Sequence, residues 1–208
     1  IHRRYNPEGL SRYNIVPGLI GTILTMTMVM LTGLAMTRER ERGTMENLLA
    51  TPVRPSEVMV GKILPYVVMG YIQLAVILLA AFALFQVPME GSMLLLMAMI
   101  GVFIIANLAV GFTFSTIARN QLQAMQMTFF FFLPSMLLSG FMFPFRAMPV
   151  WAQRVGEVLP LTHFLRIVRG ILLKGNSAPQ VLGELWPMLA FMTVVSVVAL
   201  KRYRQTLD

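Results

Sequence analysis

Long stretches without a single charged residue dominate this chain. Four of them cover residues 13–37, 63–89, 91–118 and 120–145. A helix needs about 20 residues to cross roughly 30 Å of hydrocarbon, so each stretch is long enough to span a bilayer. A fifth, Leu185–Leu200, is about 24 Å long as a helix and crosses if Glu184 lies at the headgroups and the Lys201 side chain reaches back to them. The pattern predicts an all-α integral membrane protein, a polytopic helical bundle with spans at about 15–37, 63–86, 92–117, 122–143 and 184–200.

The distribution of Lys and Arg between the spans predicts the orientation. With five spans, one side of the membrane holds Arg38–Lys62, Arg119 and Lys201–Asp208, and its basic residues are denser than those on the other side. Cytoplasmic loops carry the excess of Lys and Arg. We therefore expect a cytoplasmic C-terminus, and we expect residues 1–14 to be the end of an external segment.

The external stretch after Pro144 contains a predicted helix of its own, at about 160–174. Pro160 suits its first turn, and Gly175 with Asn176 suits its end. Its apolar stripe predicts an interfacial or a short re-entrant helix, with Trp151 and Trp186 as flanking interface aromatics. The stripe consists of Leu161, Leu165, Val168 and Leu172. On this helix His163, Arg166 and Arg169 either hold an anionic lipid headgroup or, in the interpretation we favour, only anchor the helix at the interface.

Composition agrees with a membrane protein and excludes several other classes. The chain is 57% hydrophobic and 12% charged, against about 25% charged residues in a globular domain. Its net charge of +8 lies in short gaps between apolar runs, which argues against a nucleic-acid partner. There is no cysteine, so disulfide and thiolate chemistry are excluded. The 18 methionines suit adaptable packing better than a copper site.

The stretch between the first two spans has the most distinctive pattern. Charges of both signs alternate from Arg38 to Arg42, Gly43 breaks the first helix, and Thr44 can cap a short helix at about 44–50 that Pro52 ends. On this helix Met45, Leu48 and Leu49 share one face. Such a helix either lies on lipid or fits a groove on a cytoplasmic partner.

The residues at this point resemble a known family. The run R-E-R-E-R-G-T-M-E-N-L-L-A-T-P-V at 38–53 resembles the signature loop of ABC-2 type transporter permeases, the membrane subunits of bacterial multidrug-efflux-like exporters. Four other segments resemble the same family: the first 20 residues with Y-N-P-E and V-P-G-L-I, then G-K-I-L-P-Y at 61–66, F-L-P-S-M-L-L-S-G-F-M-F-P at 132–144, and L-P-L-T-H-F at 159–164, followed by Arg166, Arg169 and Gly170.

This resemblance implies an architecture and partners. Residues 15–208 would form an ABC-2 transmembrane domain of the type V exporter kind, lacking the family's first span and most of its periplasmic domain. The helix at 44–50 would be the coupling helix that docks on an ATP-binding subunit, two copies of which would bind ATP and Mg. Further partners would be a second permease copy, identical or related, the lipid of the bacterial inner membrane and a periplasmic adaptor. The implied docking residues are Glu39, Glu41, Arg42, Gly43, Thr44, Met45, Glu46, Leu48, Leu49, Thr51 and Pro52.

Catalytic chemistry is not visible in the chain itself. It has no G-x-x-x-x-G-K-[ST] phosphate loop, so we expect no ATP site, no cofactor and no metal of its own. Gln73 and Asn107 are the polar candidates inside the spans, either for a substrate pathway or for hydrogen bonds between helices.

We expect an exporter of a hydrophobic or amphipathic, drug-like or lipid-like cargo that works by alternating access. The alternatives are a non-transporting scaffold or assembly protein, a secondary carrier, and a permease for another cargo such as a polysaccharide or an ion.

Overall fold

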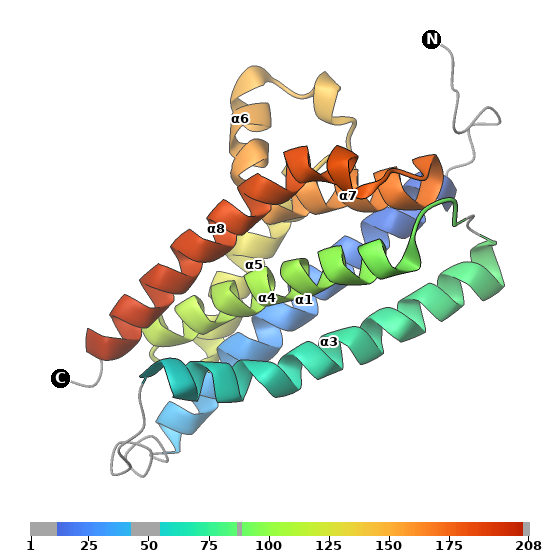
Figure 1. Ribbon diagram of the computed structural model, residues 1–208. Coiled ribbons are helices and arrows are strands. Elements are labelled where there is room, and N and C mark those ends of the chain that lie inside the picture. The colour runs from blue at the N-terminus through green and yellow to red at the C-terminus, as the bar shows by residue number, and fades with distance from the viewer. Residues whose placement is uncertain (1–11, 43–54, 87–88, 206–208) are drawn as a thin grey trace.

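The computed structural model describes residues 12–42, 55–86 and 89–205, and its regular elements there are all helices. This confirms the predicted all-α class. The elements, shown in Figure 1, are α1 (Arg12–Glu41), α3 (Pro55–Phe85), α4 (Met93–Ile117), α5 (Gln121–Leu138), the 3-10 helix η1 (Phe145–Ala147), α6 (Val150–Val158), α7 (Pro160–Lys174) and α8 (Ala178–Gln205).

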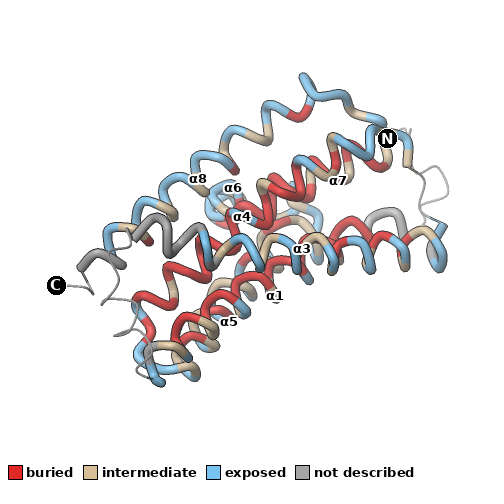
Figure 2. The backbone as a smooth tube through the Cα atoms, turned by 60° about the horizontal axis from the view of Figure 1, so that its bottom comes forward, coloured by how far each residue is buried: buried red, intermediate tan, exposed pale blue. Residues whose placement is uncertain are grey.

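Five of these helices form an up-and-down bundle. Helices α1, α3, α4, α5 and α8 alternate in direction, and the short helices α6 and α7 lie together at one end (Figure 1). The opposite end collects the end of α1, the start of α3, the turn between α4 and α5, and the end of α8. Figure 2 shows that burial concentrates on α1, α4 and α7, while α8 and much of α3 present exposed faces.

Four of the described helices are long and apolar enough to cross a membrane. They contain the candidate spans Ile15–Glu39, Ile63–Leu84, Met93–Ile117 and Ala178–Arg202. Three of these match the predicted spans 15–37, 63–86 and 92–117. The span predicted at 184–200 is longer than expected, because α8 continues through Glu184 and Lys201 without a break.

The predicted span at 122–143 is not among the four. Helix α5 has 18 residues and ends at Leu138, and its first six residues include three glutamines. The chain then turns at Gly140, whose φ of +83° favours glycine. Four of the five predicted spans are therefore confirmed, and the crossing by α5, which runs alongside the other helices of the bundle (Figure 1), stays a prediction.

Helices α1 and α4 approach each other closely at Gly111. A Cβ atom added to Gly111 of α4 would lie 2.5 Å from the carbonyl oxygen of Val29 on α1. Small residues at helix crossings allow this close approach in membrane proteins. The surrounding core is apolar, and its large, fully buried side chains include Leu24, Phe103 and Phe112.

Helix α7 is buried inside one end of this core. Its ends are those predicted, with Pro160 in the first turn and Gly175 closing the helix in the left-handed conformation. The phenyl rings of Phe164 on α7 and Phe103 on α4 stack at 3.9 Å between centroids. Eleven of the 15 residues of α7 are buried, against α8, α1 and α4. Helix α7 is thus packed within the protein, and whether it is interfacial or re-entrant in the membrane stays a prediction.

Candidate functional site

The end of α1 that leads toward the predicted coupling helix is tied to the start of α5. The carboxylate of Glu41 accepts hydrogen bonds from the backbone N–H of Gln121, at 2.8 Å, and from its side-chain amide. The side-chain oxygen of Gln121 in turn accepts from Nε of Arg38 at 3.4 Å. A carboxylate at a helix N-terminus also interacts favourably with the helix dipole. The hydrogen bonds from Gln121 hold the pKa of Glu41 below its ordinary value of 4.5.

The N-terminus of α5 is well capped around this contact. The side chain of Asn120 accepts from the backbone N–H of Gln123 at 2.8 Å, and the Gln123 side chain accepts from the N–H of Arg119 at 2.7 Å. This reciprocal pair is typical of a capped helix start. The turn between α4 and α5 is therefore a defined structure against which Glu41 rests.

The other predicted docking residues divide into two groups. Glu39 and Arg42 belong to the end of α1, where the side chain of Arg42 is exposed. The rest lie outside the described residues, so their roles stay predictions: Gly43, Thr44, Met45, Glu46, Leu48, Leu49, Thr51 and Pro52.

The two polar residues predicted inside the spans make hydrogen bonds within the protein. The hydroxyl of Thr27 on α1 lies 2.8 Å from the side-chain oxygen of Gln73 on α3. Asn107 is fully buried in α4, and its amide donates to the carbonyl of Phe103 at 2.8 Å. Its side-chain oxygen has no partner among the described residues. Neither residue belongs to the cavity near Gly140 described below.

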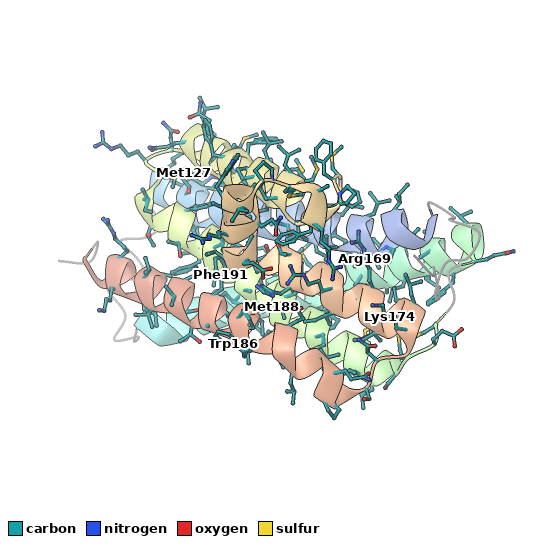
Figure 3. The ribbon with its side chains drawn as sticks, turned by 90° about the horizontal axis from the view of Figure 1, so that it is seen from above. Met127, Arg169, Lys174, Trp186, Met188 and Phe191 are labelled. Atoms are coloured by element: carbon teal, nitrogen blue, oxygen red, sulfur yellow. The ribbon has the colours of Figure 1, made fainter. Side chains whose placement is uncertain are left out.

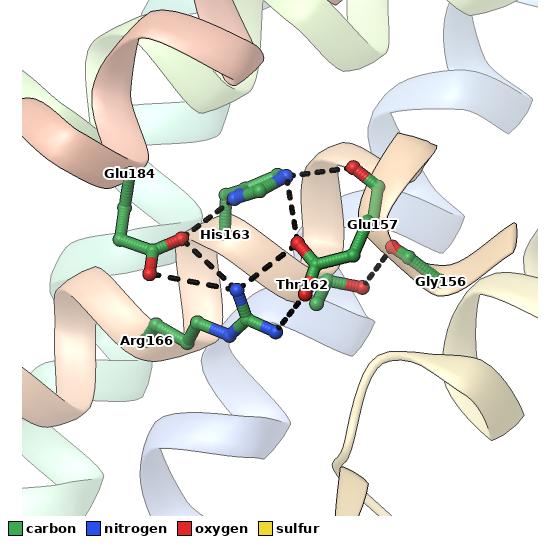
Figure 4. A network of polar contacts seen from close by, with 6 residues as sticks. All are labelled: Gly156, Glu157, Thr162, His163, Arg166 and Glu184. Carbon is green, nitrogen blue, oxygen red and sulfur yellow. Dashed lines mark hydrogen bonds and ion pairs between the residues drawn. The ribbon is translucent and has the colours of Figure 1, made fainter. Parts of the chain in front are cut away.

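A network of charged groups joins α6, α7 and α8 at the other end of the bundle (Figure 4). Arg166 on α7 donates to Glu157 on α6 at 2.6 and 3.1 Å and to Glu184 on α8 at 3.3 and 3.5 Å. His163 lies between the same two acidic residues, with its side chain only 5% exposed. The hydroxyl of Thr162 adds a hydrogen bond to the carbonyl of Gly156 at 2.6 Å. The network fastens the N-terminal part of α8 to the α6–α7 pair.

The charges in this network reinforce each other. The hydrogen bond from Arg166 holds the pKa of Glu157 below its ordinary value. Burial opposes the charge of Arg166, but its hydrogen bond to Glu157 and the charge of Glu184 together raise its pKa. The guanidinium also lies 4.7 Å from the centre of the Phe145 ring, where cation–π attraction adds to the ion pairs. Two of the basic residues that we considered for a lipid headgroup are therefore engaged by acidic partners.

A cavity of about 280 Å³ lies next to this network, lined by Arg169 and by residues 140–144. Arg169 donates to the carbonyl of Gly140 at 3.2 Å, and burial lowers its pKa.

Figure 3 shows Arg169 and Lys174 on α7, and Trp186 and Met188 on α8. The predicted interface residues Trp151 and Trp186 are 67% and 66% exposed. Within the described residues no group of three or more His, Cys, Asp or Glu side chains could hold a metal ion.

Sequence reasoning identified His163 and Arg166 but missed Glu157 and Glu184 as their partners. The available signal was Glu184 itself, an acidic residue at the edge of an apolar run. The buried position of His163 depends on how α6, α7 and α8 meet, and no local pattern encodes that arrangement.

Comparison with known proteins gives a consistent result. Residues 4–173 match the family described as ABC-2 type transporter. The chain is 31% identical over 201 residues to the probable multidrug ABC transporter permease YbhR of Escherichia coli, and 36% identical over 173 residues to the probable multidrug ABC transporter permease YbhS of the same organism. It is 32% identical over 214 residues to the inner membrane transport permease YhhJ of E. coli. These alignments cover 97%, 83% and 98% of the chain and 55%, 46% and 55% of the relatives. The chain thus spans about half the length of the curated relatives that it matches.

Proposed function

Since this chain belongs to the ABC-2 type transporter family, we propose that it is the membrane-spanning part of an ATP-driven exporter of hydrophobic or amphipathic compounds. The family consists of multi-pass membrane subunits without an ATPase domain of their own, in agreement with the missing phosphate loop. Two copies of an ATP-binding subunit would supply hydrolysis. A second permease copy, identical or related, would complete the pathway, and a periplasmic adaptor would be a further partner.

The uncharged interior of the bundle is the observation that carries the cargo class. No Asp, Glu, Lys or Arg occurs within 13–37, 63–89 or 91–118. The side-chain oxygen of Gln73 accepts from Thr27, and the amide nitrogen of Asn107 donates to the Phe103 carbonyl. A secondary carrier or an ion pathway usually keeps a charge within its spans. Apolar helix faces favour a drug-like or lipid-like cargo, and the names of the relatives YbhR and YbhS agree with a drug-like one.

The distribution of charge over the bundle supports an orientation. Arg38 and Arg42, Arg119, and Lys201 with Arg202 lie at the end where α1, α4 and α8 finish. The segments at this end, residues 38–62, 119 and 201–208, carry nine of the 17 Lys and Arg, and the longer segments at the other end carry eight. A higher density of basic residues marks the cytoplasmic side. This end would face the cytoplasm of a bacterium, α6 and α7 would face outward, and α5 would complete a fifth crossing antiparallel to α4.

ATP-driven motion would enter through the segment between α1 and α3. In this proposal Met45, Leu48 and Leu49 fill a groove on the ATP-binding subunit, and Glu39, Glu41, Arg42 and Glu46 make polar contacts around it. Alternating access would follow when two ATP-binding subunits close and push this segment against the bundle.

The test is a pair of charge-adding substitutions in the full-length protein, co-expressed with its ATP-binding subunit. Leu48→Asp places a carboxylate in the proposed apolar contact and is expected to abolish both co-purification of the subunit and ATP-dependent export from liposomes. The matched control Asn47→Asp adds the same charge at the neighbouring position and should preserve both. If Leu48→Asp still binds the subunit and exports as the control does, the docking assignment is wrong. If no ATP-binding subunit co-purifies even with the unsubstituted protein, a scaffold role is favoured.

A further inference from the structure

Both ring nitrogens of His163 face hydrogen-bond acceptors (Figure 4). Nδ1 lies 2.6 Å from Oε2 of Glu184, and Nε2 lies 2.8 Å from the backbone carbonyl oxygen of Glu157. A carbonyl oxygen can only accept, so Nε2 must carry a hydrogen. A neutral imidazole has a single N–H, and Nδ1 would then direct a lone pair at a carboxylate oxygen. Two acceptors repel each other at this distance.

The opposite tautomer does not remove the conflict. With the hydrogen on Nδ1, the contact to Glu184 is satisfied, but Nε2 directs its lone pair at the Glu157 carbonyl. The His163 side chain is only 5% exposed, so bulk water cannot supply the missing donor to both faces. A neutral histidine beside an ionised glutamate has one hydrogen for the two contacts. Both contacts become attractive only when one further proton is added.

We propose that His163 and Glu184 form a proton-binding site, in which one proton shared between Nδ1 of the buried histidine and Oε2 of the part-exposed glutamate fastens α8 to α7. This site goes beyond the transport function proposed above and needs neither an ATPase partner nor a cargo. Only the side of the membrane from which the proton enters rests on the proposed orientation.

The surrounding charges fit one added proton. Arg166 contacts both acidic residues, and its hydrogen bond keeps Glu157 ionised by lowering the pKa of that carboxyl. Two carboxylates, one guanidinium and one proton sum to a neutral cluster. The apolar stretches packed against α7, residues 13–37 of α1, 91–118 around α4 and 120–145 around α5, contain no Asp, Glu, Lys or Arg. Of the other charges on α6 and α7, Arg154 is exposed, Arg169 donates to the Gly140 carbonyl, and Lys174 ends α7. Without the proton, a net negative charge would remain at a largely apolar helix junction.

Loss of the proton should therefore weaken the attachment of α8. Both contacts of His163 are attractive only while the added proton is bound, so the stabilising effect is lost when that proton is removed. The second acidic partner, Glu157, would keep Arg166 in place, so the effect would centre on Glu184 and the N-terminal part of α8. An alkaline medium at the α6–α7 end would loosen this end of the bundle.

The direct test is nuclear magnetic resonance of the full-length protein with 15N-labelled histidine in lipid nanodiscs. The His163 signals are assigned by their loss in His163→Gln. At neutral pH we expect both ring nitrogens to be protonated, or to share a proton, in the unsubstituted protein. In Glu184→Gln we expect a single N–H on the ring, because the glutamine amide can donate to the other nitrogen. An unsubstituted protein whose Nδ1 is bare, with the same signals in Glu184→Gln, would overturn the proposal.

A second measurement does not depend on spectral assignment. The thermal unfolding midpoint of the unsubstituted protein should fall as the medium is made more alkaline, and the fall should be much smaller in Glu184→Gln. The matched control is Glu90→Gln, which removes an exposed carboxylate and should reproduce the unsubstituted pH profile. Parallel profiles for all three proteins would contradict a proton held at this pair. Neither measurement uses transport, so failure here and failure of the exporter proposal are distinguishable.

Discussion

The crossing of α1 and α4 at Gly111 can be tested with a single added methyl group. In Gly111→Ala the new Cβ atom would lie 2.5 Å from the carbonyl oxygen of Val29 and 2.9 Å from Cβ of Thr32, whereas ordinary contact begins at 3.4 Å. The shortfall of about 0.9 Å is against backbone, which no side-chain rotation can relieve. The two helices must therefore separate along their most extensive interface. Overpacking of this kind costs about 1–3 kcal/mol.

The same crossing contains its own control. Gly33 of α1 lies beside Gly111, but a Cβ atom added there would meet its nearest neighbour, the Gly111 carbonyl oxygen, at 3.6 Å. Gly33→Ala fits without strain and removes backbone freedom from a helix, which stabilises by roughly 0.5–1 kcal/mol. Gly183→Ala on α8 is a second control, since nothing lies within 4 Å of its added Cβ.

The assay is thermal unfolding of the purified full-length protein in detergent, followed by light scattering and by the loss of monodisperse elution. At roughly 2–4 °C per kcal/mol for a chain of this size, Gly111→Ala should unfold roughly 2–12 °C lower, and the two controls should unfold at or slightly above the unsubstituted midpoint. Equal midpoints for Gly111→Ala and Gly33→Ala would refute the reasoning, because the two substitutions differ mainly in the space that the methyl group enters.

Two further predictions concern the two ends of the bundle. Gln121→Ala removes the side-chain hydrogen bonds to Glu41 and Arg38 and keeps the one from the backbone N–H. In the exporter proposed here it should lower the amount of cargo moved per ATP hydrolysed in proteoliposomes, whereas the exposed Gln126→Ala on the same helix should not. Equal ratios in both variants would contradict a relay through α5. Glu157→Gln should be less stable than the unsubstituted protein at neutral pH. The lowered pKa of Glu157 gives a stabilisation that is present above pH 4.5 and is lost as pH falls below it. The unfolding midpoints of the two proteins, measured from pH 7 to pH 3.5, should therefore converge, and a constant difference would argue against the ion pair with Arg166.

The uncharged stretches were sufficient to predict most of the fold. A charge inside the hydrocarbon is costly, so a stretch of 20 or more residues without a charge marks a span. Helices α1, α3 and α4 end close to the charged or turn-forming residues that bound these stretches. The bounds of α7 were equally predictable, because Pro160 favours a helix start and Gly175 a helix end. The end of α5 was not predicted, since the turn at Gly140 interrupts an apolar stretch that composition alone would continue.

The candidate sites were predictable only in part. The pattern around Arg38–Lys62 identified the family but could not reveal that Glu41 reaches Gln121, 80 residues further along the chain. Likewise His163 was recognised as a polar residue on an apolar helix and was assigned to the interface. Its burial and its two acceptors arise where three helices meet, and this arrangement depends on tertiary packing.

The close contact at Gly111 also determines how force can pass through the bundle. Helices α1 and α4 touch backbone to backbone, and α7 is packed into the same core, so these three helices must shift as one stiff block. Helix α3 packs on α1 and α4 but lies at the edge of the bundle, with 22% of its span buried against 61% for α4. Residues 43–54 therefore connect an enclosed helix, α1, to an edge helix, α3. A push delivered at that joint would displace α3 further than α1, and the opening of a path would begin along the face of α3.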